Sequence, residues 1–425
     1  MDLSFLQKGT WRSVGRVLEL APFVAALIVM PYVIPGGRAW PWSPNSMDLR
    51  VYWEAGQAVL NGQDIIDMRF TGNSLAFIYP MFAALIAVPL SFVPYKLLQV
   101  AWTLFSVWLI RTLLRRFGVP PGVAIGVVGT LTVLLCQPVR ATLGYGQVNV
   151  IVMALVLLDL LPGRRLGPRG LMTGLAASIK LTPGLFGLYT AGLRRWRDAA
   201  WTFGLLIVST AVGFLVLPTE SREFWRSLLI DQDTRTGAAY YLGNQSVLGG
   251  MVRLLGNTAD VKVAATLIGA VVALLAVWAA VHWSRAGEEL FALSIVGLGT
   301  LMASPLSWTH HFVWVLPLSF ALFRYALPRS IKVVGGLFSV WVWSGLILQW
   351  LPYDKDRELA YGLFENLVSA ITPALGVTLV LLALLAGRRT RPVVAETPPS
   401  TAEAIPAPEF VDQTGAHHQL PQPAF

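Results

Sequence analysis

Residues 303–317 read A-S-P-L-S-W-T-H-H-F-V-W-V-L-P, a run in which two adjacent histidines interrupt apolar and aromatic residues. An ionisable side chain at membrane depth is costly unless it faces a cavity, a partner or the wet interface. His310 and His311 are therefore the first candidates for a functional site. An interfacial belt, in which Trp308 and Trp314 anchor the chain at the level of the lipid headgroups, is the simpler explanation of the same residues.

The composition around this run predicts a polytopic membrane protein. The 425 residues are 55% hydrophobic and 13% charged, with a mean hydropathy of +0.61, outside the range of soluble domains. The net charge of +9 lies largely in short arginine-rich loops between apolar runs, a pattern typical of cytoplasmic loops, so it implies no nucleic acid partner. The single cysteine, Cys136, excludes an intrachain disulfide and a cysteine-based zinc cluster.

The beginning of the chain predicts a cytoplasmic N-terminus at residues 1–17 and an uncleaved first helix from about Leu18 to Ile34. A P-G-G sequence then stops the helix, which makes residues 35–76 the first external segment. Within it, apolar residues at helical spacing predict an amphipathic helix from Met47 to Leu60 on the outer leaflet, with Ser46 as a candidate cap.

The number of crossings depends on two basic segments that are long enough to count in either way. A strict charge rule favours ten crossings and hydropathy favours twelve, and we predict about twelve. Under both topologies the membrane body spans residues 18–387, and a disordered cytoplasmic tail follows it. The ranges predicted to be external are 35–76, 218–260, 304–310 and 352–362.

Asp48 is the main candidate for acid–base chemistry. The sequence contains no nucleotide-binding motif, so an external site suits a donor that the membrane itself presents, such as a lipid-linked sugar. Such a reaction needs a general base for the acceptor hydroxyl and groups that stabilise the departing phosphate. Arg50, Tyr52 and Trp53 lie close to Asp48 in sequence and suit a phosphate and a sugar ring. Alternatively, Asp48 only stabilises the start of the helix through the helix dipole, an effect of about 0.3–1 kcal/mol.

Further candidates for substrate binding are polar and aromatic residues of loops, helix starts and broken helices: Tyr240, Tyr241, Asn244, Gln245, Gln147, Asn149, Lys180 and Trp308. Loop composition alone explains the first four equally well. Gln147 and Asn149, which lie at a predicted helix start, are equally suited to helix capping. The lysine either contacts a lipid phosphate or extends to the membrane interface from a broken helix.

Several motifs together resemble glycosyltransferase family 87, the actinobacterial polyprenol-phosphate-mannose-dependent mannosyltransferases of GT-C type. They are M-D-L-R-V-Y-W-E-A-G-Q-A-V-L-N-G, F-I-Y-P-M-F-A-A-L-I-A-V-P-L, G-Q-V-N, I-K-L-T-P, G-N-Q-S and S-P-L-S-W-T-H-H-F-V-W. The resemblance covers roughly Leu18 to Leu385. It implies an all-α GT-C enzyme in the plasma membrane, with its active site facing the periplasm. Met81 departs from the family, where a second proline commonly follows Y-P.

The resemblance also implies an activity, an inverting transfer of mannose from polyprenyl-phosphate-mannose to a phosphatidylinositol mannoside or lipomannan, usually through α-1,2 linkages. The catalytic aspartate of the family falls on Asp48 and its functional histidine on the S-W-T-H-H motif, where we favour His311 and leave His310 open. We expect no cofactor and no metal, with Asp231 and Asp233 as the rival ligand pair. The alternatives are a polyprenyl-phosphate-dependent arabinosyl or glucosyl transferase and, in another class, a lipid or solute transporter.

Overall fold

A computed structural model describes residues 9–66, 68–70, 75–230, 237–353 and 355–387. Over these ranges the secondary structure is helical, and the extended pairings are three isolated bridges. The prediction of an all-α protein is therefore confirmed. The tail at residues 388–425 and the Asp231–Asp233 pair lie outside the described residues.

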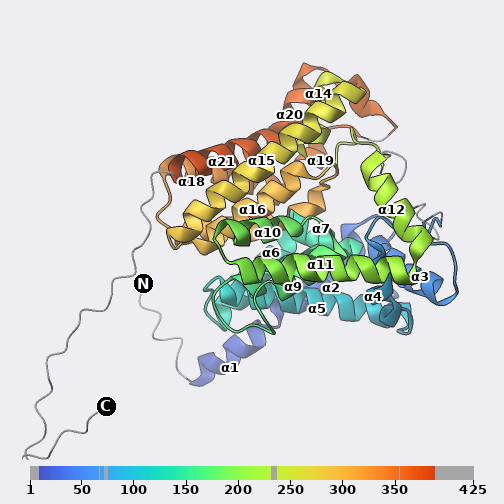
Figure 1. The fold of residues 1–425 in the computed structure, drawn as a ribbon. Coiled ribbons are helices and arrows are strands. Elements are labelled where there is room, and N and C mark those ends of the chain that lie inside the picture. The colour runs from blue at the N-terminus through green and yellow to red at the C-terminus, as the bar shows by residue number, and fades with distance from the viewer. Residues whose placement is uncertain (1–8, 67, 71–74, 231–236, 354, 388–425) are drawn as a thin grey trace, which may run out of the picture.

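The first half of the chain forms the lower body in Figure 1, with α1 at one end and α3 and α12 at the other. Its helices are α1 (Gly9–Leu18), α2 (Ala21–Val33), α3 (Met47–Leu60), α4 (Met81–Ser91), α5 (Tyr95–Arg116), α6 (Val123–Leu135), α7 (Gln137–Tyr145), α8 (Asn149–Leu160), α9 (Leu171–Ile179), α10 (Gly184–Gly192), α11 (Trp196–Val216) and α12 (Pro218–Ile230).

The second half forms the upper body, in which α15 and α21 run side by side (Figure 1). Its elements are α14 (Val247–Leu255), α15 (Ala259–Arg285), α16 (Glu289–Ala303), the 3-10 helix η2 (Thr309–Trp314), α17 (Val315–Arg324), α18 (Arg329–Ser344), α19 (Ile347–Trp350), the 3-10 helix η3 (Arg357–Ala360), α20 (Leu363–Ser369) and α21 (Ile371–Gly387).

Four stretches of the described residues are long and apolar enough to cross a membrane as single helices: Ser13–Val33, Tyr95–Arg116, Trp196–Val216 and Ala259–Arg285. Two bent helix pairs raise this number to six if each pair counts as one span. The helices α4, α8 and α16 are apolar but shorter. The chain is an integral membrane protein, whereas about twelve crossings stays a prediction.

Breaks inside the apolar runs explain why few helices span the bilayer alone. The apolar stretch at residues 171–193 is helical as α9 up to Ile179, becomes extended at Lys180 (φ −145°, ψ 122°), and is helical again as α10. Similarly, α6 and α7 meet at Cys136 with a bend of 75°. Hydropathy averages over such breaks, so the number of apolar runs alone does not give the number of membrane-spanning helices.

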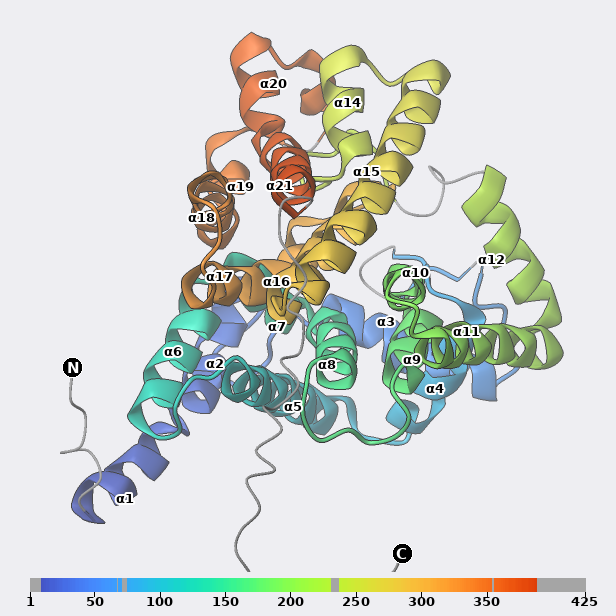
Figure 2. The same cartoon turned by 60° about the vertical axis from the view of Figure 1, so that its left-hand side comes forward.

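The helix α16 is the centre of the second half. Every residue from Leu290 to Met302 is buried, because α16 packs against α15, α17, α21 and η2. Figure 2 shows it directly beside α15. By contrast, Leu267, Val271 and Leu274 form a stripe on α15 that is 62%, 54% and 58% exposed. Lipid tails are as apolar as leucine, so a bilayer covers such a stripe without the cost that water would impose.

The predicted helix from Met47 to Leu60 is present with the same bounds as α3, and it packs against α4. The prediction that Ser46 caps it is wrong, since the Ser46 side chain makes no cap hydrogen bond and the residue is left-handed (φ 47°). Instead, the Ser46 N–H donates to the Gly144 carbonyl, and the Tyr95 hydroxyl donates to the Ser46 carbonyl at 2.9 Å. The start of α3 is thus held by α7 and α5.

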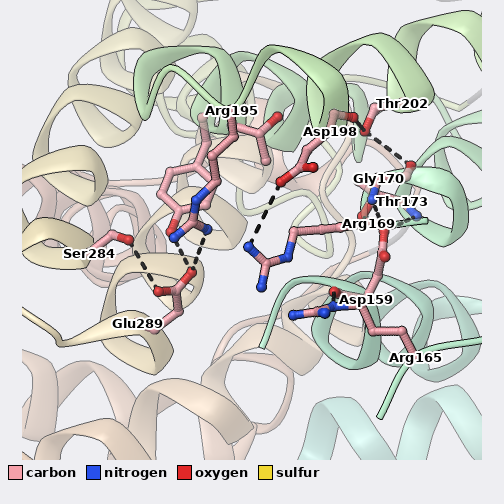
Figure 3. A network of polar contacts seen from close by, with 12 residues as sticks. Asp159, Arg165, Arg169, Gly170, Thr173, Arg195, Asp198, Thr202, Ser284 and Glu289 are labelled. Atoms are coloured by element: carbon pink, nitrogen blue, oxygen red, sulfur yellow. Dashed lines mark hydrogen bonds and ion pairs between the residues drawn. The ribbon is translucent and has the colours of Figure 1, made fainter. Parts of the chain in front are cut away.

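A polar network joins the helix ends where α9 and α16 begin (Figure 3). One oxygen of the buried Asp159 carboxylate, Oδ2, accepts from the N–H groups of Gly170 and Thr173, both at 2.9 Å, and from Thr173 Oγ1 at 2.7 Å. In the same network, Glu289 pairs with Arg195 at 3.3 Å. A side chain of α8 therefore caps the first turn of α9, which removes the cost of unpaired N–H groups there.

We expect Asp159→Leu to lower the free energy of unfolding by about 2–4 kcal/mol, because two buried N–H donors lose their acceptor. The measurement is denaturant unfolding of the purified protein in one detergent. Asp198→Asn is the control, since the Asp198 pair with Arg169 is 3.9 Å long and partly exposed, and such pairs contribute about 0–1 kcal/mol. Equal stability of the two variants would contradict the capping role.

Candidate active site

A cavity of about 560 Å³ lies where α9 and α16 end, whereas the Asp159 network lies where these helices begin. Its walls come from α3, residues 75–80 before α4, the end of α7, the α9–α10 break, α12, α19, and residues 241–243 and 304–311. These walls include parts of three ranges predicted to be external. Asp48, Lys180, His310 and His311 all line this cavity, although they lie far apart in the sequence.

Asp48 lies in the first turn of α3 and is half-buried on the cavity wall. Burial raises the pKa of its carboxyl group to about 7, although the positive charge of Lys180 and a hydrogen bond with Gln147 act in the opposite direction. A carboxylate with a pKa near the working pH is suited to general base catalysis, because it is both available and basic enough to accept a proton.

Two tyrosines fix the orientation of Gln147 behind Asp48. The Tyr52 hydroxyl donates to Gln147 Oε1 at 2.8 Å, and Gln147 Nε2 donates to the Tyr79 hydroxyl at 2.9 Å. Gln147 and Tyr79 line the cavity, whereas Tyr52 lies behind them and is buried. The network holds the Gln147 amide where it contacts the candidate base.

The two histidines lie in η2, whose start is fixed from below by α7 and α8. The His310 carbonyl accepts from Thr142 Oγ1 at 2.9 Å and from Asn149 Nδ2 at 3.0 Å. The His310 ring packs against Tyr145 with a centroid distance of 4.9 Å, and its buried Nε2 has no hydrogen-bond partner within the described protein. The His311 ring is hydrogen-bonded to the backbone of Leu306. Both rings can therefore offer a nitrogen to a bound molecule.

Several predicted substrate residues instead hold the external loops together. Asn244 donates to the carbonyls of Ala239 and Pro305, at 2.9 and 3.0 Å, and accepts from the Ser307 N–H at 3.0 Å. It also forms an antiparallel bridge with Trp308. Because these bonds use its amide, Asn244 positions the S-W-T-H-H segment and does not face the cavity.

A similar structural role falls to Gln245, whose Nε2 donates to the Leu242 carbonyl at 2.6 Å. The buried Arg253 completes the arrangement, since its guanidinium donates to the carbonyls of Tyr240, Tyr241 and Asn244 at 3.3, 3.1 and 2.8 Å. Arg253 was not among the residues predicted from the sequence. One arginine thus fixes the backbone of the loop that carries Tyr241 to the cavity.

The remaining predicted residues divide between the cavity wall and its surroundings. Tyr241 and Trp308 line the cavity and contact each other with a centroid distance of 5.5 Å. Arg50 lies 5.0 Å from the Tyr95 ring centroid, Trp53 Nε1 donates to the Val93 carbonyl at 3.0 Å, and Tyr240 donates to Asp356 at 2.7 Å. These three side chains therefore lie outside the cavity lining.

Six polar residues of the lining were not predicted from the sequence: Tyr79, Tyr145, Thr182, Ser227, Ser304 and Thr309. Tyr79 and Thr182 belong to motifs quoted above, F-I-Y-P-M-F-A-A-L-I-A-V-P-L and I-K-L-T-P, and Tyr145 directly precedes the G-Q-V-N motif. The position of these three residues in the sequence, in or next to the motifs, could have identified them. The described residues contain no group of three or more histidine, cysteine, aspartate or glutamate side chains arranged to hold a metal ion.

The fold and this cavity define an integral membrane protein that brings a proton acceptor and a cation to one chamber. The sequence model of glycosyltransferase family 87 matches residues 77–305, more than half of the chain. The chain belongs to this family, and the protein is a glycosyltransferase. Asp48 and the two histidines lie outside the matched range, so the case for them rests on geometry.

The chain is similar to two curated mycobacterial proteins. It is 32% identical to the polyprenol-phosphate-mannose-dependent α-(1-2)-phosphatidylinositol pentamannoside mannosyltransferase of Mycolicibacterium smegmatis, over 80% of this chain and 83% of the relative. It is 30% identical, with the same coverage of both chains, to the polyprenol-phosphate-mannose-dependent α-(1-2)-phosphatidylinositol mannoside mannosyltransferase of Mycobacterium tuberculosis. No solved structure matches the chain.

Proposed function

We propose that the protein transfers mannose from polyprenyl-phosphate-mannose to a phosphatidylinositol mannoside or a lipomannan-type glycolipid, forming an α-1,2 linkage with inversion. The observation that carries this proposal is the shared cavity, which places Asp48 together with Lys180 and the two histidines. The names of the relatives support the donor and the acceptor class. The reaction requires no nucleotide, in agreement with the absence of nucleotide motifs from the sequence.

In the proposed mechanism, Asp48 accepts the proton of an acceptor hydroxyl while the hydroxyl oxygen attacks the anomeric carbon of mannose. The bond between this carbon and the phosphate oxygen breaks, and its electron pair leaves with polyprenyl phosphate. A single displacement of this kind inverts the anomeric configuration and needs no covalent intermediate. Gln147, held by Tyr52 and Tyr79, keeps the Asp48 carboxylate in place.

The other lining residues have supporting roles in this proposal. His311 contacts the donor at its phosphate end, and the unpartnered Nε2 of His310 accepts a hydrogen bond from a substrate hydroxyl. Tyr241 and Trp308 offer aromatic surface to the apolar face of a sugar ring.

The proposed location is the plasma membrane, with about twelve crossings and the cavity open to the periplasm. The helix α3 then lies at the outer membrane surface, where its first turn holds Asp48 at the depth of the lipid headgroups. In this orientation α5 crosses the membrane alone, since α4 is a shorter helix, and the basic end of α5 faces the cytoplasm.

The direct test is transfer of labelled mannose from polyprenyl-phosphate-mannose to phosphatidylinositol mannosides by the purified protein in lipid nanodiscs. Polyprenyl-phosphate-linked arabinose and glucose serve as competing donors. We expect a mannosylated product that an α-1,2-specific mannosidase degrades. If the protein transfers arabinose or glucose in preference to mannose, the assignment of mannose as the donor sugar is wrong. Movement of lipid without any transfer would favour a transporter.

The rate of transfer should rise with pH up to about 7 and then level off. Asp48 acts as a base only when ionised, and burial raises the pKa of its carboxyl group to about 7, so acid protonates it and removes the base. Below this pH, kcat/KM should fall about tenfold per pH unit. The measurement is kcat/KM across the pH range with wild-type protein. A flat profile between about pH 5.5 and 8 would contradict the assignment of the base.

A further inference from the structure

The break between α9 and α10 brings hydrogen-bonding side chains to one corner of the main cavity. A second cavity of about 20 Å³ adjoins this corner. Four residues line both cavities, and all four carry polar side chains: Lys180, Thr182, Ser304 and His311. The smaller cavity has room for one water-sized group, such as a phosphoryl oxygen.

Lys180 is held in this corner by its neighbours. Its Nζ donates to Asn149 Oδ1 at 3.1 Å. Asn149 is fixed in turn, because its Nδ2 donates to the His310 carbonyl at 3.0 Å, the same oxygen that accepts from Thr142. The amide of Asn149 therefore has a determined orientation, with its oxygen toward the ammonium group. An oriented ammonium group with one bond to a neutral amide keeps donors for a further ligand.

The proposed reaction places a specific demand on this corner. When the bond to mannose breaks, the phosphate changes from a monoanionic diester to a monoester with up to two negative charges. Groups that bind this charge more strongly as it develops accelerate the step. Among the described residues that line the cavity, Lys180 is the only lysine or arginine. An ordinary histidine has a pKa near 6.5, so His310 and His311 provide no permanent positive charge at neutral pH.

We propose that Lys180, together with Thr182, binds the phosphate of the lipid donor and stabilises it as the leaving group. Asn149 is a positioning residue that aims the ammonium group. This inference rests on the proposed function and deepens it. The shared chemistry is a phosphate ester of a membrane lipid, and the phosphodiester of a phosphatidylinositol acceptor is the second possible source.

The test measures equilibrium binding of a labelled polyprenyl monophosphate to the full-length protein in nanodiscs, with neutral polyprenol and phosphatidylinositol as the comparison lipids. We expect wild type to prefer the monophosphate over polyprenol. Lys180→Met should reduce monophosphate affinity about 10- to 100-fold without changing the affinity for polyprenol, and Lys180→Arg should restore most of it. Asn149→Leu should reduce the same preference by a smaller factor. The matched control is Lys332→Met, which removes an exposed lysine at the start of α18.

Each result decides the inference separately from the proposed function. If Lys180→Met binds the monophosphate as tightly as wild type and has wild-type stability, the inference is overturned. Mannose transfer by wild type would still support the proposed function. Selective loss of phosphatidylinositol binding overturns the assignment to the donor. Equal affinity of wild type for the monophosphate and polyprenol would overturn the inference. If wild type also fails to transfer mannose, the proposed function is overturned as well. If Lys180→Met unfolds, the folded Lys180→Arg variant decides: a kept preference for the monophosphate supports the inference, and loss of this preference overturns it.

Discussion

Asp48→Asn should lower turnover by about 10²- to 10⁴-fold while donor binding changes little. Asparagine keeps the size and polarity of the side chain but has no oxygen that accepts a proton at neutral pH. The contacts of the donor exist in the ground state and do not depend on this proton acceptor. The measurement is the single-turnover rate together with donor affinity in one nanodisc preparation.

Asp260→Asn is the matched control for this substitution. Asp260 lies in the first turn of α15, as Asp48 does in α3, but it is exposed and does not line the cavity. We expect Asp260→Asn to keep full activity. A second check is the pH profile, which should lose its dependence near pH 7 in Asp48→Asn if that dependence arises from the Asp48 carboxyl group. An active Asp48→Asn enzyme would rule out Asp48 as the base.

The sequence predicted those parts of this site that depend on local patterns. The helix from Met47 to Leu60 has the predicted bounds, because its apolar residues recur at helical spacing. The histidine pair was recognisable because ionisable side chains are rare in apolar runs. The motif I-K-L-T-P also marked the break between α9 and α10, where Lys180 turns toward the cavity.

Contacts between distant segments were not predictable in the same way. Asn244 looked like a sugar ligand, since amides are frequent in binding loops, yet its bonds to Pro305 and Ser307 hold two loops together. Nothing in the local sequence of Arg253 indicates that it reaches three carbonyls of the 240–244 segment. Composition reports which groups are polar, whereas the partner that each group finds depends on the tertiary fold.

His311→Ala should lower kcat/KM by about 10²- to 10³-fold and weaken donor binding as well, whereas His310→Ala should have a milder effect. The difference follows from position. His311 lines both the main cavity and the small cavity beside Lys180, and a contact at the phosphate end exists in the ground state and in the transition state. His310 packs against Tyr145, and its carbonyl, which the substitution keeps, provides the contacts with Thr142 and Asn149.

Donor affinity and the single-turnover rate of both variants separate these roles, and His282→Ala is the matched control. His282 lies near the end of α15, where its ring contacts the carbonyl of Trp278 away from the cavity. His311→Gln should recover part of the binding, because an amide N–H replaces the imidazole N–H but carries no ionisable proton. If His311→Ala is fully active and His310→Ala is inactive, the roles assigned to the two histidines must be exchanged. In that case the unpartnered Nε2 of His310, and not the ring at the small cavity, would hold the donor.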